Sequence, residues 1–131
     1  LDKLKNIYNI SGAKLVSFMC GGVSARMDKD YFWSGLDKLK NIYDISGAKL
    51  VSFMCNGVSS RMDKDYFWSG LDKLKNIYYI SGEKLQTFMC NSVAARLNYP
   101  QLYLELDKIK DNINEKNLKK LKREITKIIK L

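Results

Sequence analysis

A short helical pattern of apolar residues follows Ser11, which we predict to be the N-cap of a helix. Leu15, Phe18 and Met19 are spaced so that they lie on one face of that helix, and the pattern ends at Cys20. Seven or eight residues form only a marginal helix in isolation (about two turns). This helix therefore needs a neighbour against which its apolar face can pack.

A second, longer pattern begins near Ser24 and continues for about five turns. Glycine destabilises a helix interior by about 1 kcal/mol relative to alanine, so we predict a kink or a break at Gly35. The apolar positions of the pattern are Met27, Tyr31, Phe32, Leu36, Leu39, Ile42 and Tyr43. We expect the aromatic cluster of Tyr31, Phe32 and Trp33 to pack between repeats, and not to stack on bases.

Both patterns recur with a period of 35 residues. Residues 36–70 differ from residues 1–35 at only three positions, where Asn9, Gly21 and Ala25 become Asp44, Asn56 and Ser60. A third copy begins at residue 71, and a fourth begins as LDKIK at residue 106 but lacks the FMC segment. We therefore divide the chain into three tandem repeats, 1–105, and a degenerate repeat with a cap, 106–131.

One 35-residue unit is too small to bury both of its apolar faces, so neighbouring units must stack. The sequence therefore predicts an all-α fold, and more specifically an α-solenoid of two-helix repeats with a C-terminal capping helix. The cap has an apolar stripe at Leu118, Leu121, Ile125 and Ile128.

The short loop between the two helical patterns is one of the places where the repeats differ. The adjacent pair is GG in the first unit, NG in the second and NS in the third: Gly21-Gly22, Asn56-Gly57 and Asn91-Ser92. Two neighbouring changes at a helix junction indicate a specificity site. The further variation at Asn9, Asp44 and Tyr79 has no role in that interpretation, so a protein-binding helical scaffold stays open as an alternative.

The three units resemble the repeats of transcription activator-like effectors. Ser46 falls on that family's N-cap, Asn56-Gly57 falls on its variable base-recognition pair, and its apolar short-helix positions correspond to Leu50, Val51 and Phe53. The resemblance implies a right-handed superhelix that binds double-stranded DNA in the major groove and regulates transcription. It also implies recognition of about one base per repeat by the inter-helix loop. A location in the bacterial cytoplasm follows, or in a host nucleus for a translocated effector.

The residue types near the loop are compatible with DNA binding. A glycine at the second loop position leaves room for the thymine methyl group. An arginine follows each loop in the predicted first turn of the longer helix, where unpaired N–H groups favour a phosphate. The phosphate-binding candidates are Arg26, Arg61 and Arg96, with hydroxyl contacts from Ser24, Ser59 and Ser60. Ion pairs with nearby aspartates are the structural alternative for these arginines.

The formal charge of +9 favours an anionic partner, and the basic residues are most concentrated at the C-terminus. Residues 106–131 contain nine Lys or Arg against four Asp or Glu. The KKLKR segment at 119–123 is interpreted as the solvated face of the cap. A nuclear-import signal or an additional phosphate contact is the alternative.

The composition argues against catalysis, because the chain has no histidine. Cys20, Cys55 and Cys90 are 35 residues apart, which suits reduced packing residues and neither a disulfide framework nor a metal site. We expect no enzymatic activity, cofactor, metal, small-molecule substrate or membrane span, and a monomer. The chain starts at Leu1 without a signal peptide, so we expect a fragment of a longer protein. A pentatricopeptide-like RNA-binding repeat is a further alternative.

Overall fold

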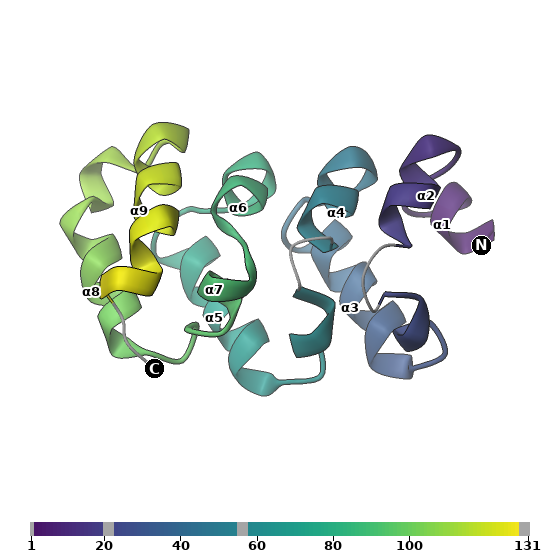
Figure 1. Cartoon of the computed structure of the whole chain (residues 1–131), viewed down its shortest axis with the longest axis horizontal. Helices are drawn as coiled ribbons and strands as arrows, with labels where there is room; N and C mark the ends of the chain where they lie inside the picture. Colours follow the sequence, from purple (N-terminus) through teal and green to yellow (C-terminus); the bar gives the residue numbers. More distant parts are fainter. Residues whose placement is uncertain (1, 20–22, 55–57, 129–131) are drawn as a thin grey trace.

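The computed structural model describes residues 2–19, 23–54 and 58–128, and the regular structure in these ranges is helical. Figure 1 shows the helices following one another along the long axis, from α1 at one end to α8 and α9 at the other. The predicted all-α fold class is confirmed. The elements are α1 (Asp2–Asn6), α2 (Ala13–Phe18), η1 (Ser24–Arg26), α3 (Asp30–Asn41), α4 (Gly47–Phe53), η3 (Ser59–Arg61), α5 (Asp65–Asn76), α6 (Gly82–Phe88), α7 (Asn91–Ala94), α8 (Pro100–Lys108), η4 (Lys110–Asn112) and α9 (Glu115–Ile128).

The short helices pack on one another in chain order. Helix α2 contacts α4, α4 contacts α6, and α9 contacts both α6 and α7. The predicted apolar face is present, since Phe18 is buried and Leu15 and Met19 pack against the core. Ser46 and Ser81 occupy the N-cap positions of α4 and α6, but neither side chain makes a capping hydrogen bond. The N-cap of α2 is Gly12 and not the predicted Ser11.

The long helical pattern is interrupted at a different place from the one predicted. Helices α3 and α5 run through Gly35 and Gly70 without a break, and the interruption lies at the turn residues 27–29, between η1 and α3. Our repeat boundaries at 35/36, 70/71 and 105/106 therefore fall inside α3, α5 and α8. A repeat in sequence has no intrinsic starting point, so its boundaries need not coincide with the ends of helices.

Gly35 and Gly70 allow close packing of successive units. A Cβ atom added at Gly35 would overlap Met62 Cε and lie 3.1 Å from Trp68 Cζ2. A Cβ added at Gly70 would lie 2.7 Å from Leu97 Cβ. The predicted break is therefore wrong: α3 and α5 continue through these glycines, which allow close contacts between units.

A set of polar contacts connects each unit to the next at the same register. The hydroxyls of Tyr8 and Tyr43 donate to the carboxylates of Asp37 and Asp72, 29 residues further along the chain. Tyr78 donates in the same way to Asp107 at 2.6 Å. Backbone hydrogen bonds run parallel to them, from Gly47 N–H to Tyr8 O at 2.9 Å and from Gly82 N–H to Tyr43 O at 2.8 Å.

The aromatic residues pack into the core between successive long helices: Phe32 is buried, and Tyr31 and Trp33 pack against it. Trp68 stacks on Tyr43 with ring centroids 6.2 Å apart, and its indole N–H donates to Met62 O at 2.8 Å. Lys38 Nζ lies 4.7 Å from the centroid of the Trp68 ring. The buried side of this contact is therefore apolar, while on its outer side the Lys38 ammonium lies over the Trp68 ring.

Helix α9 takes the place of a fourth short helix and covers α6. Leu118, Leu121 and Ile125 are buried, which confirms those three positions of the predicted stripe, whereas the Ile128 side chain lies outside the described structure. On the other face Lys119, Lys120 and Arg123 are exposed and Lys122 is half-buried. Cys90 is half-buried against the core, and Cys20 and Cys55 lie outside the described residues. No helix in the described part of the chain is long and apolar enough to span a membrane.

Candidate nucleic-acid interface

The predicted base-recognition pairs are only partly visible. Gly21, Gly22, Asn56 and Gly57 lie outside the described residues. The third pair, Asn91-Ser92, begins helix α7 and does not form a loop: Asn91 O accepts a hydrogen bond from Ala95 N–H at 2.9 Å. The third unit has no glycine at these positions, so nothing favours a positive φ, and the segment closes a helical turn.

The arginines are not where the sequence analysis expected them. Arg26 and Arg61 end the 3₁₀ helices η1 and η3, ahead of α3 and α5, and both are half-buried. Three-residue helices have too few aligned N–H groups to form the anion site that we expected at a helix N-terminus. Arg96 is only 5% exposed and its Nη1 donates to Ser92 O at 2.9 Å, so its guanidinium is not presented to a phosphate.

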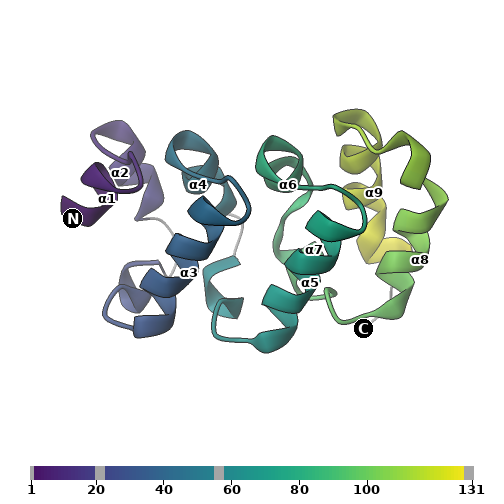
Figure 2. The ribbon, with the colours of Figure 1, turned by 180° about the vertical axis from the view of Figure 1, so that it is seen from behind.

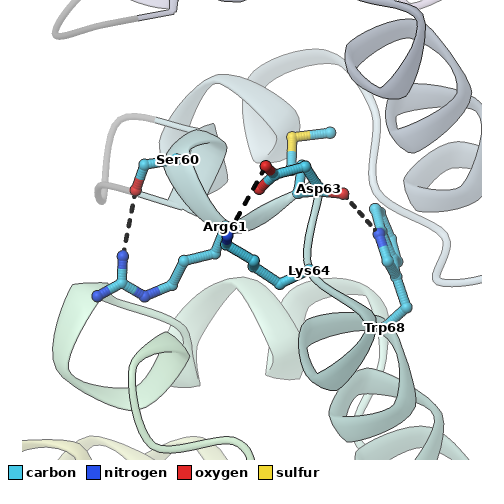
Figure 3. A network of polar contacts seen from close by, with 6 residues as sticks. Ser60, Arg61, Asp63, Lys64 and Trp68 are labelled. Carbon is cyan, nitrogen blue, oxygen red and sulfur yellow. Dashed lines mark hydrogen bonds and ion pairs between the residues drawn. The ribbon is translucent and has the colours of Figure 1, made fainter.

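Figure 3 shows the surroundings of Arg61. Its Nη1 donates to Ser60 Oγ at 3.2 Å, and its Nε is buried with no hydrogen-bond partner among the described atoms. Lys64 and Asp63 form an ion pair of 3.9 Å close by. Ser59 is buried, and Ser24 lies in η1 with its side chain outside the described structure. The predicted phosphate-binding residues therefore do not form one exposed basic surface.

The other variable position of the repeat lies at an exposed turn. Asn9, Asp44 and Tyr79 follow the ends of α1, α3 and α5, and all three have left-handed backbone with φ of 60°, 59° and 57°. Beyond Asp44, Ile45 N–H donates back to Leu39 O at 2.8 Å, which closes the end of α3. The variable side chains are directed outward, and Tyr79 is 77% exposed. The variation at these positions is visible in the sequence, but their left-handed backbone and exposure are visible only in the structure.

A lysine follows each variable residue after five positions. It lies early in each of the helices that stack on one another, α2, α4, α6 and α9: Lys14, Lys49, Lys84 and Lys119. The residue five positions before Lys119 is Asn114, whose Oδ1 accepts the Asn117 N–H at 2.9 Å at the start of α9. We call these eight residues the turn edge: Asn9, Asp44, Tyr79 and Asn114 with Lys14, Lys49, Lys84 and Lys119.

The turn edge is continuous from one unit to the next. A Cβ added at Gly47 would lie 3.6 Å from Asn9 Nδ2, and one added at Gly82 would lie 3.5 Å from Asp44 Oδ2. The side chains of Asn9 and Asp44 therefore lie against the glycine of the following turn. Figures 1 and 2 show the turns after α3, α5 and α8 at one edge of the molecule, and the segments before these helices at the opposite edge.

Comparison with known proteins adds no relative from which a site could be transferred. No family model, curated protein or solved structure matches the chain. In the residues that the structure describes, no group of three or more His, Cys, Asp or Glu side chains is placed to hold a metal ion. The functional argument therefore depends on the turn edge itself.

Proposed function

We propose that the chain is a modular α-solenoid of two-helix repeats that binds double-stranded DNA through its turn edge, as a non-enzymatic monomer. The observation that carries this proposal is the regular pairing of one lysine with one exposed, variable residue in each unit. Lysines that recur every 35 residues suit a polymer with regularly spaced phosphates, and the net charge of +9 favours association with such a polyanion.

Side-chain chemistry assigns different roles to the lysines and to the variable residues of the turn edge. The lysine ammonium groups attract phosphates whatever the base sequence. The neighbouring variable side chains differ in their hydrogen-bonding groups: Asn9 has an amide, Asp44 accepts only, and Tyr79 has a phenol. Such differences discriminate among base edges in a groove, so we assign base preference to these three positions. The pairs at 21–22, 56–57 and 91–92 are the alternative positions for base recognition.

A protein-binding scaffold is the second candidate, and one observation favours it. Ile7, Ile42 and Ile77 are 43%, 45% and 44% exposed, and each lies two residues before a variable residue. Apolar side chains exposed at regular spacing are typical of surfaces that contact protein. Binding measurements with duplex DNA, duplex RNA and single strands distinguish this candidate and the RNA-binding alternative from the proposal.

The first prediction concerns salt dependence. In a titration of the full chain with duplex DNA, the variant Lys49→Gln/Lys84→Gln/Lys119→Gln should bind more weakly to all sequences. Its logarithmic salt slope should fall by about 0.9 for each phosphate that the protein no longer neutralises. The control Lys29→Gln/Lys64→Gln removes charge at the other end of α3 and α5, which are about 18 Å long, and should leave the slope unchanged.

Two results would contradict the choice of surface or of partner. A slope that falls in Arg26→Gln/Arg61→Gln but not in the lysine variant would move the interface to the opposite edge. Absence of salt-dependent binding to any nucleic acid would reject the proposal and leave the protein-binding scaffold.

The second prediction concerns base preference. Exchange of the variable residues, Asp44→Tyr with Tyr79→Asp, should exchange the base preferences of the second and third units while the affinity for unrelated duplex stays similar. Each good direct contact discriminates by about 1–3 kcal/mol. The measurement is binding to duplexes in which one base pair at a time is varied. The control tests the other variable pair. Residues 56 and 91 are both asparagine, so only the second position of the pair can be altered. The control variant is therefore Gly57→Ser, which should not change the preferred base sequence.

A further inference from the structure

A cavity of about 320 Å³ lies within the third repeat, where the end of α5 meets the start of α8. Six side chains line it: Lys73, Ile77, Tyr78, Asn98, Pro100 and Tyr103. None of these residues belongs to the turn edge. The cavity volume is at the lower end of the range for small-molecule sites.

Every lining residue has a counterpart 35 positions earlier, within the second repeat, where the end of α3 meets the start of α5. Lys73, Ile77 and Tyr78 repeat Lys38, Ile42 and Tyr43 without change, whereas the other three differ. The differing residues are Asn98 in place of Asp63, Pro100 in place of Asp65, and Tyr103 in place of Trp68. Relative to its counterpart, the junction with the cavity therefore lacks one indole ring and two carboxylates.

The contacts that hold the two aromatic rings are equivalent. Tyr103 stacks on Tyr78 with centroids 6.3 Å apart and an interplanar angle of 19°, and its hydroxyl donates to Leu97 O. Lys73 Nζ lies 4.8 Å from the Tyr103 centroid. The phenol thus occupies the position of the Trp68 indole but is smaller, so part of the space that an indole fills in the second unit is vacated here.

The chemistry of the lining selects a class of ligand. Two phenol rings, an isoleucine and a proline form flat and apolar walls, while Lys73 supplies a positive charge and Asn98 supplies amide donors. The Tyr78 hydroxyl is directed to Asp107 at 2.6 Å, and so it belongs to the junction and not to the ligand site. The six lining side chains include one cation and no carboxylate.

We propose that this cavity binds a small planar aromatic carboxylate, with its ring against Tyr103 and Pro100 and its carboxylate near Lys73. The ligand is bound and not chemically changed. A planar aromatic ring suits the cavity because the equivalent position in the second repeat holds the Trp68 indole. A negative charge suits it because Lys73 is present and the two aspartates of the second repeat are replaced by Asn98 and Pro100. This site is independent of the proposed DNA interface.

Indole-3-acetate and the neutral 3-methylindole are suitable probes, titrated into the full chain by calorimetry and followed by amide NMR shifts. Indole-3-acetate should bind with shifts centred on the residues lining the cavity. Tyr103→Trp restores the side chain of the earlier units and should weaken binding by about tenfold or more, because the new ring fills the cavity. Asn98→Asp should weaken indole-3-acetate by roughly five- to tenfold through repulsion between like charges, and leave 3-methylindole unchanged.

The Tyr103→Trp and Asn98→Asp substitutions introduce residues that the earlier units already have at these positions, so both variants should fold. Retained unfolding midpoints in urea check that they do. The proposal is overturned if the probe causes no shifts around residues 73–78 and 98–103, or if both folded variants bind indole-3-acetate as well as the original chain.

Discussion

Gly70→Ala is expected to lower the free energy of unfolding by about 1–3 kcal/mol, the usual cost of overpacking a filled core. The added Cβ would lie 2.7 Å from Leu97 Cβ and 3.2 Å from its Cγ. Leu97 Cβ is fixed to the backbone, so relief requires movement of the whole segment between α7 and α8. An alanine in an unobstructed helix interior would instead gain about 1 kcal/mol over glycine. The clash must therefore exceed that gain.

Gly35→Ala is the informative comparison, because its obstruction is of another kind. The nearest atom to the added Cβ is Met62 Cε, the far end of a flexible side chain, and the Trp68 ring lies 3.1 Å away. Methionine can adopt another rotamer at low cost, so we expect a smaller decrease in stability than at Gly70.

Urea denaturation at constant m value measures both glycine variants. Ser34→Ala and Ser69→Ala alter the exposed neighbours in the same two helices and should be neutral or slightly stabilising. If Gly70→Ala were as stable as Ser69→Ala, α5 and the segment at Leu97 would not be as closely packed as the structure has them.

These glycines also show where prediction from sequence stops. The helical period and the 35-residue repeat are local signals, and they predicted the all-α class and the stripe of Leu118, Leu121 and Ile125 in the cap. Helix propensity is local too, and from it Gly35 was interpreted as a break. The residues that require glycine there, Met62 and Trp68, are in the next unit, and their proximity is a property of the folded chain.

The candidate interface was missed for a related reason. Asn9 and Asp44 are residue types that tolerate the left-handed conformation, which marks a turn, but Tyr79 at the same position conceals that signal. Sequence comparison of the units could identify the variable positions. It could not show that Asn9, Asp44 and Tyr79 lie at exposed turns with left-handed backbone, because that depends on where the helices end in the folded chain.

The second large effect is expected at alkaline pH, where the protein should lose stability steeply. Burial raises the pKa of Tyr8, Tyr43 and Tyr78 well above the ordinary value of 10.0, and hydrogen bonds to aspartates and the negative charge of those carboxylates raise it further. Burial also raises the pKa of Tyr103, to about 12. Tyr8, Tyr43 and Tyr78 donate to aspartates of the following unit, and Tyr103 stacks on Tyr78. Their ionisation therefore opposes the packing of successive helices.

The direction follows from proton binding in the two states. Below pH 10 the tyrosines are protonated in both the folded and the unfolded chain, so stability is at its full value. Between pH 10 and about pH 12 the unfolded chain has released protons that the folded chain still holds. Folding then requires proton uptake, and the free energy of unfolding falls with pH by about 1.4 kcal/mol per pH unit for each such tyrosine.

Tyr43→Phe isolates one of these groups. At neutral pH it should cost about 1.5–3 kcal/mol, because the Asp72 carboxylate no longer has the hydroxyl as a hydrogen-bond donor. Above pH 10 the free energy of unfolding of the variant should fall less steeply with pH, by about 1.4 kcal/mol per pH unit, because phenylalanine cannot ionise. The measurement is the urea midpoint from neutral pH to pH 12, with tyrosinate absorbance followed in parallel. A midpoint independent of pH across this range would show that the tyrosine hydroxyls are not held at the junctions, and equal slopes in the variant and the original chain would exclude the bond between Tyr43 and Asp72.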